Sequence, residues 1–313
     1  MRLLITGALG HIGSRLIRVL PVGVLEQVYL LDNLSTQRYP SLFDLSRFIP
    51  FRFIEEDILT ADLEARFKGI DAVVHLAAMT NAEASLGNPE AVERTNLLGT
   101  RRVAEACAAN GAKLVFISST SVYGVQDIEV DETCPVEQLK PQSPYAHSKL
   151  KAEFLLKDMG ASDGLEFAIC RFGTIFGTSP GMRFHTAVNK FVWQACNGLP
   201  VTVWSSAANQ KRPYLALEDS VRALLFILEH GVFDRETYNV VTANATVQEI
   251  VELIRQHVPD LSVKYVDSPI MNQLSYAVSS QRFMDKGFTF EGSLESGIKE
   301  SVELWSGLLA WEA

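Results

Sequence analysis

The first twenty residues pass from a strand pattern through a glycine-rich turn into a helix pattern. Residues 2–6 are a short apolar run typical of a buried parallel strand, and residues 14–20 have helical periodicity. Three glycines lie between them: Gly7, Gly10 and Gly13. The first permits a tight turn, the second lets the backbone approach a pyrophosphate, and the third lets the helix pack closely on the sheet. Phosphates would lie at the helix N-terminus, where unpaired amides and the helix dipole favour negative charge. The pattern predicts a strand–turn–helix unit that binds a dinucleotide.

An acid at the end of the next strand pattern indicates which dinucleotide binds. Residues 27–31 are largely apolar and are followed by Asp32, nineteen residues after Gly13. A carboxylate at this position accepts hydrogen bonds from the ribose hydroxyls and repels a 2′-phosphate, so it favours NAD over NADP. Residues 33–36 contain no basic side chain, whereas Arg38 is close enough to keep NADP open as the alternative.

Strand and helix patterns alternate through the first half of the chain. Further strands are expected at residues 51–54, 71–78, 113–119 and 166–171, with helices over residues 88–110 and from Pro144. Repeated strand–helix pairs imply right-handed crossovers, and therefore an α/β fold with a doubly wound parallel (Rossmann) sheet. Ligands bind such sheets beyond the carboxyl ends of the strands. The candidates expected at that edge are Asp32, Asp57, Ala77 and Ser119.

The pattern loosens after Arg171, where glycines and prolines separate shorter elements. We therefore expect residues 1–171 to form the NAD-binding domain and residues 172–313 to form mainly a smaller, substrate-binding α/β domain. Residues 219–228 have a helix pattern that would return to the main sheet. The two domains are thus expected to interleave, through a return near residues 213–232.

Composition limits the class of protein. The 313 residues, 47% of them hydrophobic, suit one large or two modest domains with a full core. The net charge of −9 argues against a nucleic-acid partner, whose phosphates need a basic surface. The four cysteines are widely spaced, and with the six histidines they show no metal-ligand pattern. The start of the chain leaves no room for a signal peptide, and no apolar run is long enough to span a bilayer. These features predict a soluble cytoplasmic enzyme without a metal.

Tyr145 and Lys149 stand four residues apart, on one face of the predicted helix. An ammonium beside a phenol favours the phenolate, so the pKa of Tyr145 is expected to fall toward working pH. Ser119, at the carboxyl end of a predicted strand, would share the proton being moved. Such a set can take a proton from a sugar or alcohol hydroxyl while hydride leaves the same carbon.

Together these motifs resemble the extended short-chain dehydrogenase/reductase family, in its nucleotide-sugar epimerase and dehydratase branch. The matching segments are Gly7–Gly13, Asp32-Asn33-Leu34, Asp57-Ile58, His75-Leu76-Ala77-Ala78, Asn96 with Gly99-Thr100, Ser118-Ser119 ahead of Val122-Tyr123-Gly124, and Ser143-Pro144-Tyr145 with Lys149. The resemblance implies that Tyr145 is the base and that Ser119 is its hydroxyl partner. It also implies that Lys149 holds the nicotinamide ribose, that Asp57 and Ile58 meet the adenine, and that the protein forms a homodimer.

The candidate cofactor contacts are therefore Gly7, Gly10, His11, Ile12, Gly13, Asp32, Asn33, Asp57, Ile58, Leu76, Ala77, Ala78, Asn96, Tyr145 and Lys149. Two of them have further interpretations. His11 shapes or covers the turn and is not expected to be catalytic. Asn96 is expected to be buried on its helix and to brace the active-site strand through hydrogen bonds.

The two positions after Ser119 discriminate among reactions. In the resembling family, 4,6-dehydratases carry Asp-Glu there, and decarboxylases usually keep a glutamate at the second position. Here they are Thr120 and Ser121, neither of which is an acid at neutral pH. A 4-epimerase needs no second acid, so an NAD-dependent epimerase of a UDP-hexose is predicted. The alternatives are a 4-ketosugar reductase, a dehydratase with unusual acids, and a non-catalytic protein that senses NAD.

A nucleoside-diphosphate sugar is the expected ligand, and the candidate residues for it are Thr80, Ser119, Thr120, Thr174, Asn189, Arg212 and Arg282. Arg212 is the preferred diphosphate ligand because a guanidinium offers a planar fork of donors. Arg282 is a second candidate for that role. Residues 179–185 are distinctive, and Arg183 within them is a further candidate to face the substrate.

Overall fold

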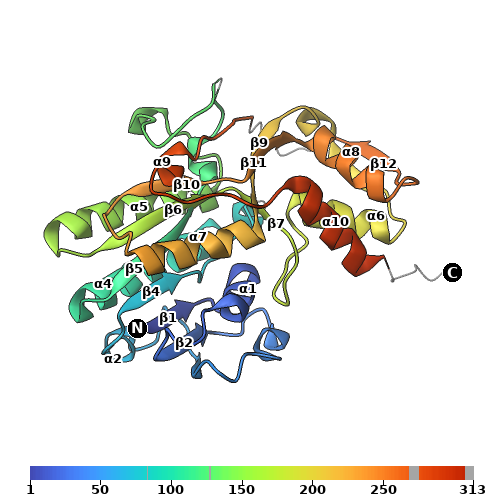
Figure 1. Ribbon diagram of the computed structural model, residues 1–313. Coiled ribbons are helices and arrows are strands. Elements are labelled where there is room, and N and C mark those ends of the chain that lie inside the picture. The colour runs from blue at the N-terminus through green and yellow to red at the C-terminus, as the bar shows by residue number, and fades with distance from the viewer. Residues whose placement is uncertain (83, 127, 268–274, 307–313) are drawn as a thin grey trace.

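The computed structural model describes residues 1–82, 84–126, 128–267 and 275–306 (Figure 1). Its main layer is a seven-stranded sheet in the order β10-β6-β5-β4-β1-β2-β3, with every neighbouring pair parallel. The strands are β1 (Arg2–Thr6), β2 (Gln27–Asp32), β3 (Phe51–Glu55), β4 (Ala72–His75), β5 (Lys113–Ser119), β6 (Phe167–Phe172) and β10 (Thr237–Val240). The strand order reverses between β1 and β4, which places the ligand crevice at the carboxyl ends of these two strands. The predicted doubly wound α/β fold is confirmed.

Helices cover both faces of this sheet because successive residues of each strand point to opposite sides. Leu3 and Ile5 belong to the core that includes α1 (His11–Val19) and α7 (Leu217–His230). Leu4 belongs to the core on the other face, with α4 (Gly99–Asn110) and α5 (Pro144–Ser162). The short α2 (Leu63–Arg66) also packs on that second face.

The C-terminal region adds two small sheets, with the strand orders β11-β9-β7 and β12-β8. The strands are β7 (Thr174–Phe176), β8 (Val201–Trp204), β9 (Lys211–Ala216), β11 (Ala243–Thr246) and β12 (Val263–Val266). The helices are α6 (Ala187–Cys196), α8 (Val247–His257), α9 (Gln281–Met284) and α10 (Leu294–Trp305). α6, α8 and α10 share a separate apolar core and lie together to one side of the main sheet (Figure 1).

Three predicted elements differ in extent from the observed ones. The strand expected at residues 71–78 ends at His75, and irregular backbone follows it. The helix expected at residues 88–110 consists of α3 (Pro89–Glu93), a π-helical turn (Arg94–Leu98) and α4. The return predicted near residues 213–232 contains α7 but stops short of β10, which pairs with β6 and completes the sheet.

Three further features bear on the class of protein. Among the helices within the described ranges, none combines the length and apolarity that crossing a bilayer requires. Over the same ranges no group of three or more His, Cys, Asp or Glu side chains is arranged to hold a metal ion. The cysteines Cys107, Cys134, Cys170 and Cys196 are all free thiols.

Candidate active site

The glycine-rich turn after β1 is tightly enclosed. Gly7 has φ +64°, and a Cβ on it would lie 2.6 Å from the backbone nitrogen of Ala77. A Cβ on Gly13 would lie 2.4 Å from the carbonyl oxygen of Ala8. Both positions therefore require glycine, one for its left-handed conformation and close approach, the other for the packing of α1 on the turn. The turn and the segment after β4 form the two sides of the crevice.

Three of the expected cofactor residues are linked at the carboxyl ends of β2 and β3. The Asp32 carboxylate accepts hydrogen bonds from the backbone amides of Leu9 and Leu34, each at 3.0 Å. The Asn33 amide donates to the Asp57 carboxylate at 2.8 Å. The sheet edge thus gathers Asp32, Asn33 and Asp57 beside the glycine-rich turn, as their positions at strand ends predict. Ile58 is buried and lies against Gly99 of α4.

Asn96 holds the segment after β4 in place through hydrogen bonds. Its side-chain oxygen accepts from the Met79 amide at 2.8 Å, and its nitrogen donates to the Met79 carbonyl and the Ser148 hydroxyl, each at 3.0 Å. The side chain is fully buried. Asn96 therefore positions residues 76–80, which include Leu76, Ala77 and Ala78, and its amide faces the protein rather than open space.

Ser119 and Tyr145 meet where β5 ends and α5 begins. The Ser119 hydroxyl accepts from the Ser121 amide at 3.2 Å and from the Ser121 hydroxyl at 2.9 Å. Because these bonds occupy Ser119 as an acceptor, its own proton is left to be donated. Ser143 caps α5 by accepting from the Ala146 amide, which fixes the first turn that carries Tyr145.

The charges around Tyr145 differ from the prediction. Burial raises the pKa of the Tyr145 phenol, while a hydrogen bond with Ser119 and the positive charge of Arg183 act to lower this pKa. Lys149 donates to the Ile117 carbonyl at 2.7 Å and lies over the Phe116 ring at 4.7 Å. Burial lowers the pKa of Lys149 itself to about 7. Ser119 and Arg183, rather than Lys149, thus act to lower the pKa of Tyr145 in this structure, and the expected effect of Lys149 on this pKa stays a prediction.

A buried ion pair supports the catalytic helix. Arg171 on β6 donates to the Glu153 carboxylate at 2.7 Å, and both side chains are almost fully buried. Ser118 also donates to Glu153, and the Arg171 guanidinium lies 4.8 Å from the centre of the Tyr123 ring. Glu153 lies one helical turn after Lys149 on α5. Through Arg171 on β6 and Ser118 on β5, its carboxylate connects these two strands to the catalytic helix. No motif in the sequence distinguished Glu153.

Several substrate candidates come together beside Ser119. The Thr120 hydroxyl is buried, 3.5 Å from the Tyr276 hydroxyl and 3.4 Å from the Phe172 carbonyl oxygen. Burial raises the pKa of Tyr276, while the hydrogen bond with Thr120 and the charge of Arg212 on β9 act to lower this pKa. Thr174 on β7 pairs with Tyr214, two residues after Arg212 on β9. Tyr276 was not a sequence candidate, because a single tyrosine between turn residues carries no motif.

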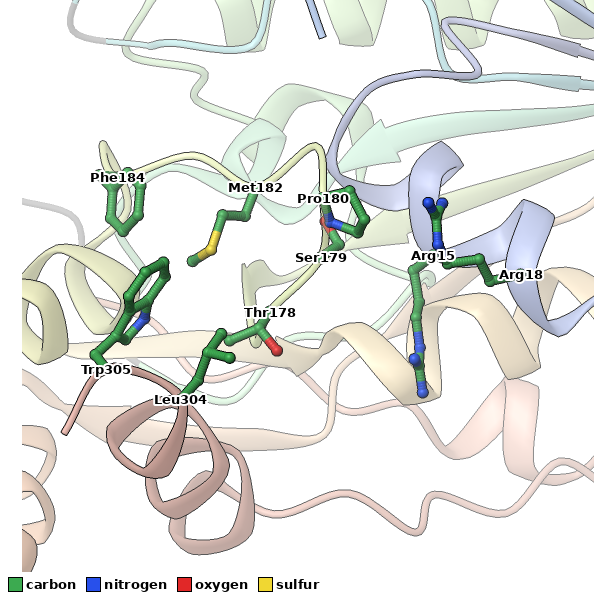
Figure 2. A pocket seen from close by; sticks show the side chains of 9 residues that line it. All are labelled: Arg15, Arg18, Thr178, Ser179, Pro180, Met182, Phe184, Leu304 and Trp305. Atoms are coloured by element: carbon green, nitrogen blue, oxygen red, sulfur yellow. The ribbon is translucent and has the colours of Figure 1, made fainter. Parts of the chain in front are cut away.

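Two other candidates have structural partners of their own. Asn189 accepts from the Gly177 amide at 3.1 Å and donates to the Arg183 carbonyl at 3.2 Å, so it anchors the loop between them. Thr80 accepts a hydrogen bond from the Arg183 guanidinium. Figure 2 shows part of this loop, residues 178–184, between α1 and the end of α10, where a cavity of about 590 Å³ lies.

Arg282 lies elsewhere. Its guanidinium is 3.1 Å from the Glu236 carboxylate and 4.0 Å from that of Glu132. Glu236 directly precedes β10, so this cluster is at the amino end of the edge strand, whereas Ser119 is at the carboxyl end of β5. The structure does not bring Arg282 to the site, and the suggestion that it binds the diphosphate is not supported.

The residues around the turn fit a dinucleotide diphosphate. His11, at the start of α1, is nine-tenths buried and its Nε2 has no hydrogen-bond partner. One guanidinium nitrogen of Arg38 and one of Arg183 are likewise buried without a partner. Buried polar groups are normally paired, so the two guanidinium nitrogens lack an acceptor such as an anion, whereas His11 Nε2 lacks a donor.

Comparisons with known proteins agree with this geometry. The model of the NAD-dependent epimerase/dehydratase family matches residues 3–240. The uncharacterized UDP-glucose epimerase YtcB of Bacillus subtilis is 33% identical, over 81% of each chain. The UDP-glucose 4-epimerase of Thermus thermophilus, solved in complex with NAD, is 28% identical with a TM-score of 0.85, over 99% of this chain and 100% of that one.

A plant relative is longer. The trifunctional UDP-glucose 4,6-dehydratase/UDP-4-keto-6-deoxy-D-glucose 3,5-epimerase/UDP-4-keto-L-rhamnose-reductase of Arabidopsis thaliana is 29% identical over 99% of this chain. The match covers 47% of the plant protein, so the chain spans about half the length of this relative. The family match, the fold and the turn lead to one conclusion: the chain belongs to the NAD-dependent epimerase/dehydratase family, with NAD as its cofactor.

Proposed function

We propose that the protein is a nucleoside-diphosphate-sugar 4-epimerase that acts on a UDP-hexose. The observation that carries the proposal is that no carboxylate follows Ser119 directly or acts on the pKa of Tyr145 among the described residues. Thr120 and Ser121 follow Ser119, and both engage hydroxyl or carbonyl partners. Among the described residues, the groups that shift the pKa of Tyr145 are Ser119, Arg183 and Tyr276, none of which is a carboxylate.

A 4-epimerase needs one acid–base group at C4 and nothing that eliminates water from the sugar. Tyr145 takes the proton of the C4 hydroxyl and later returns it, and Ser119 orients that hydroxyl through its free proton. Bound NAD supplies the hydride acceptor and donor for C4. Lys149 holds the nicotinamide ribose, and its buried ammonium favours the ionised phenol once both ligands are in place. Arg212 binds the diphosphate of the sugar nucleotide, which leaves the oxidised sugar free to turn over.

The proposed epimerase differs from its rivals by its products. A dehydratase eliminates water between C5 and C6 and needs a second acid, which the Thr120–Ser121 pair does not supply. The plant relative supports keeping dehydratase and reductase chemistry as rivals, because its name includes both. A non-catalytic NAD sensor would have no need of Ser119, Tyr145 and Lys149 together.

The test is proton NMR of the purified protein with NAD in heavy water, first with UDP-glucose and then with UDP-N-acetylglucosamine. We expect a new C4-epimer signal without deuterium in the sugar, because hydride returns from the cofactor directly. Deuterium at C5 or a 4-keto-6-deoxy product would overturn the proposal in favour of a dehydratase. Stoichiometric loss of added NADH with a 4-ketosugar would establish the reductase, and no product with either sugar would overturn an epimerase of these two UDP-hexoses.

The proposed enzyme is a homodimer in the cytoplasm. Phe154 on α5 and Leu98, the last residue of the π-helical turn before α4, support the dimer, because both are large apolar side chains exposed in the single chain. Contact between two copies would remove this surface from water. Light scattering of the purified protein measures the mass directly, and a monomer at micromolar concentration would exclude a stable dimer.

A further inference from the structure

Residues 177–185, which we call the strap, come from the C-terminal region and lie directly on the glycine-rich turn. The Gly181 amide donates to the Ser14 hydroxyl at 3.0 Å, and the Ser179 hydroxyl is 2.8 Å from His11 Nδ1. A Cβ on Gly181 would lie 2.4 Å from the Leu9 carbonyl oxygen and 2.5 Å from that of Gly10. The strap therefore packs backbone against backbone on the turn, at a distance that only glycine permits.

The strap brings Arg183 to the phosphate side of the turn. One guanidinium nitrogen of Arg183 donates to Thr80, and the other terminal nitrogen lies 3.9 Å from where a Cβ on Gly10 would stand. Its Nε is buried without a partner. Arg183 thus spans the crevice from the segment after β4 to the glycine-rich turn, and part of its fork of donors remains unused.

Arg183 lies near a second cation, Arg38, and its charge is opposed in part by the Asp32 carboxylate. Burial, and next the charge of Arg38, lower the pKa of Arg183 to about 10. Burial and the charges of Arg183 and Arg38 lower the pKa of His11 to about 3, so this histidine is neutral. The N-terminus of the nine-residue α1 adds its own positive potential at the same place. An anion carrying two charges would relieve the repulsion between Arg183 and Arg38 and accept from their unused donors.

We propose that Arg183 is a direct ligand of the NAD diphosphate, and that the strap closes over the cofactor and retains it. The proposal rests on the family's dependence on NAD and not on which sugar reaction the chain catalyses. An arginine fork matches two phosphate oxygens better than a point charge does. The strap belongs to residues 172–313, the region expected to bind substrate. The cofactor would therefore be held by residues from both domains.

The test compares two arginine variants in protein stripped of nucleotide. In Arg183→Met the dissociation constant for NAD, measured by titration calorimetry, is expected to rise about 10- to 100-fold, because a charged hydrogen-bonding ligand is lost. Arg15→Met is the matched control, since the Arg15 side chain on α1 is partly exposed and is paired with Glu218 at 2.7 Å. It loses the same charge and should bind NAD within about twofold of the unchanged protein. Arg183→Lys should lie between the two.

Gly181→Ala tests the strap while keeping every charge. Its Cβ cannot fit against the turn, so NAD should dissociate faster in stopped-flow displacement, with a thermal unfolding curve that still shows a folded protein. UDP alone should bind to Arg183→Met and to Gly181→Ala as tightly as it binds to the unchanged protein. Unchanged NAD affinity in Arg183→Met overturns the proposal, as does weaker UDP binding with NAD unaffected. Both readouts are independent of sugar turnover, so they stand apart from the test of the epimerase.

Discussion

The two sides of the active site are built differently. On the nucleotide side, Asp32 ends β2 and Asp57 closely follows β3, and these two strands are paired and parallel, so the register of the sheet places both residues. On the substrate side, the contacts join residues far apart in the chain: Thr120 meets Tyr276, and Thr80 meets Arg183. The first side is positioned by regular structure and short motifs, and the second by loops that come from distant parts of the chain.

This difference has consequences for mutational effects. Changes on the nucleotide side should act on chemistry, folding and cofactor binding together, because the same residues pack the sheet and face the crevice. Changes on the substrate side should act on ligand affinity and leave the folded sheet intact. Four predictions follow this division, from the largest expected effect to the smallest.

Tyr145→Phe should lower turnover by about a thousandfold or more, since positioned acid–base groups contribute roughly 10²–10⁴-fold. The ring remains, so α5 and the NAD affinity should be unchanged. Steady-state rates with the sugar identified by NMR measure the loss, and calorimetry measures NAD binding. Near-normal turnover in this variant would mean that Tyr145 is not the base.

Glu153→Gln should lower the free energy of unfolding by about 3 kcal/mol, because it leaves the buried Arg171 guanidinium without a counter-charge. Urea unfolding measures this loss. The double variant Glu153→Leu/Arg171→Met should regain much of the stability, since an apolar pair of similar volume replaces a buried ion pair at little cost. Equal instability of the single and double variants would show that packing, not unpaired charge, governs this position.

Gly7→Ala should lower the free energy of unfolding by about 2 kcal/mol and weaken NAD binding, because it combines a positive φ with a contact of 2.6 Å to Ala77. Gly164→Ala is the matched control, with φ +71° and nothing within 4 Å of the new Cβ. It should cost about 1 kcal/mol, from backbone conformation alone. If the two variants are equally stable and bind NAD alike, the close approach of residue 7 to Ala77 contributes neither to the free energy of unfolding nor to NAD affinity.

The same division explains what the sequence could predict. The glycine-rich turn, Asp32 and the strands leading to them were predictable because apolar runs and glycine spacing are local signals. The positions of Tyr276 and Glu153 were not, since neither belongs to a short pattern and both contacts depend on packing between distant segments. Arg282 fitted the chemistry of a diphosphate ligand, but its place beside Glu236 is set by the edge strand β10, which was not predicted. On the substrate side, the residue types therefore indicated which ligand chemistry they suit, but not where those residues lie in the fold.

Arg212→Met and Arg282→Met sharpen the comparison on the substrate side. Arg212 lies with Tyr276 and Thr120 beside Ser119, so its loss should weaken UDP binding about tenfold, in the range of a charged hydrogen bond. Arg282 pairs with Glu236 at the amino end of β10, so its loss should leave UDP affinity within about twofold. Calorimetric titration with UDP measures both, and thermal unfolding should be similar in the two variants. If Arg282→Met weakened UDP binding and Arg212→Met did not, the diphosphate would bind outside the Ser119 cluster, and the substrate side would have to be placed along the edge strand instead.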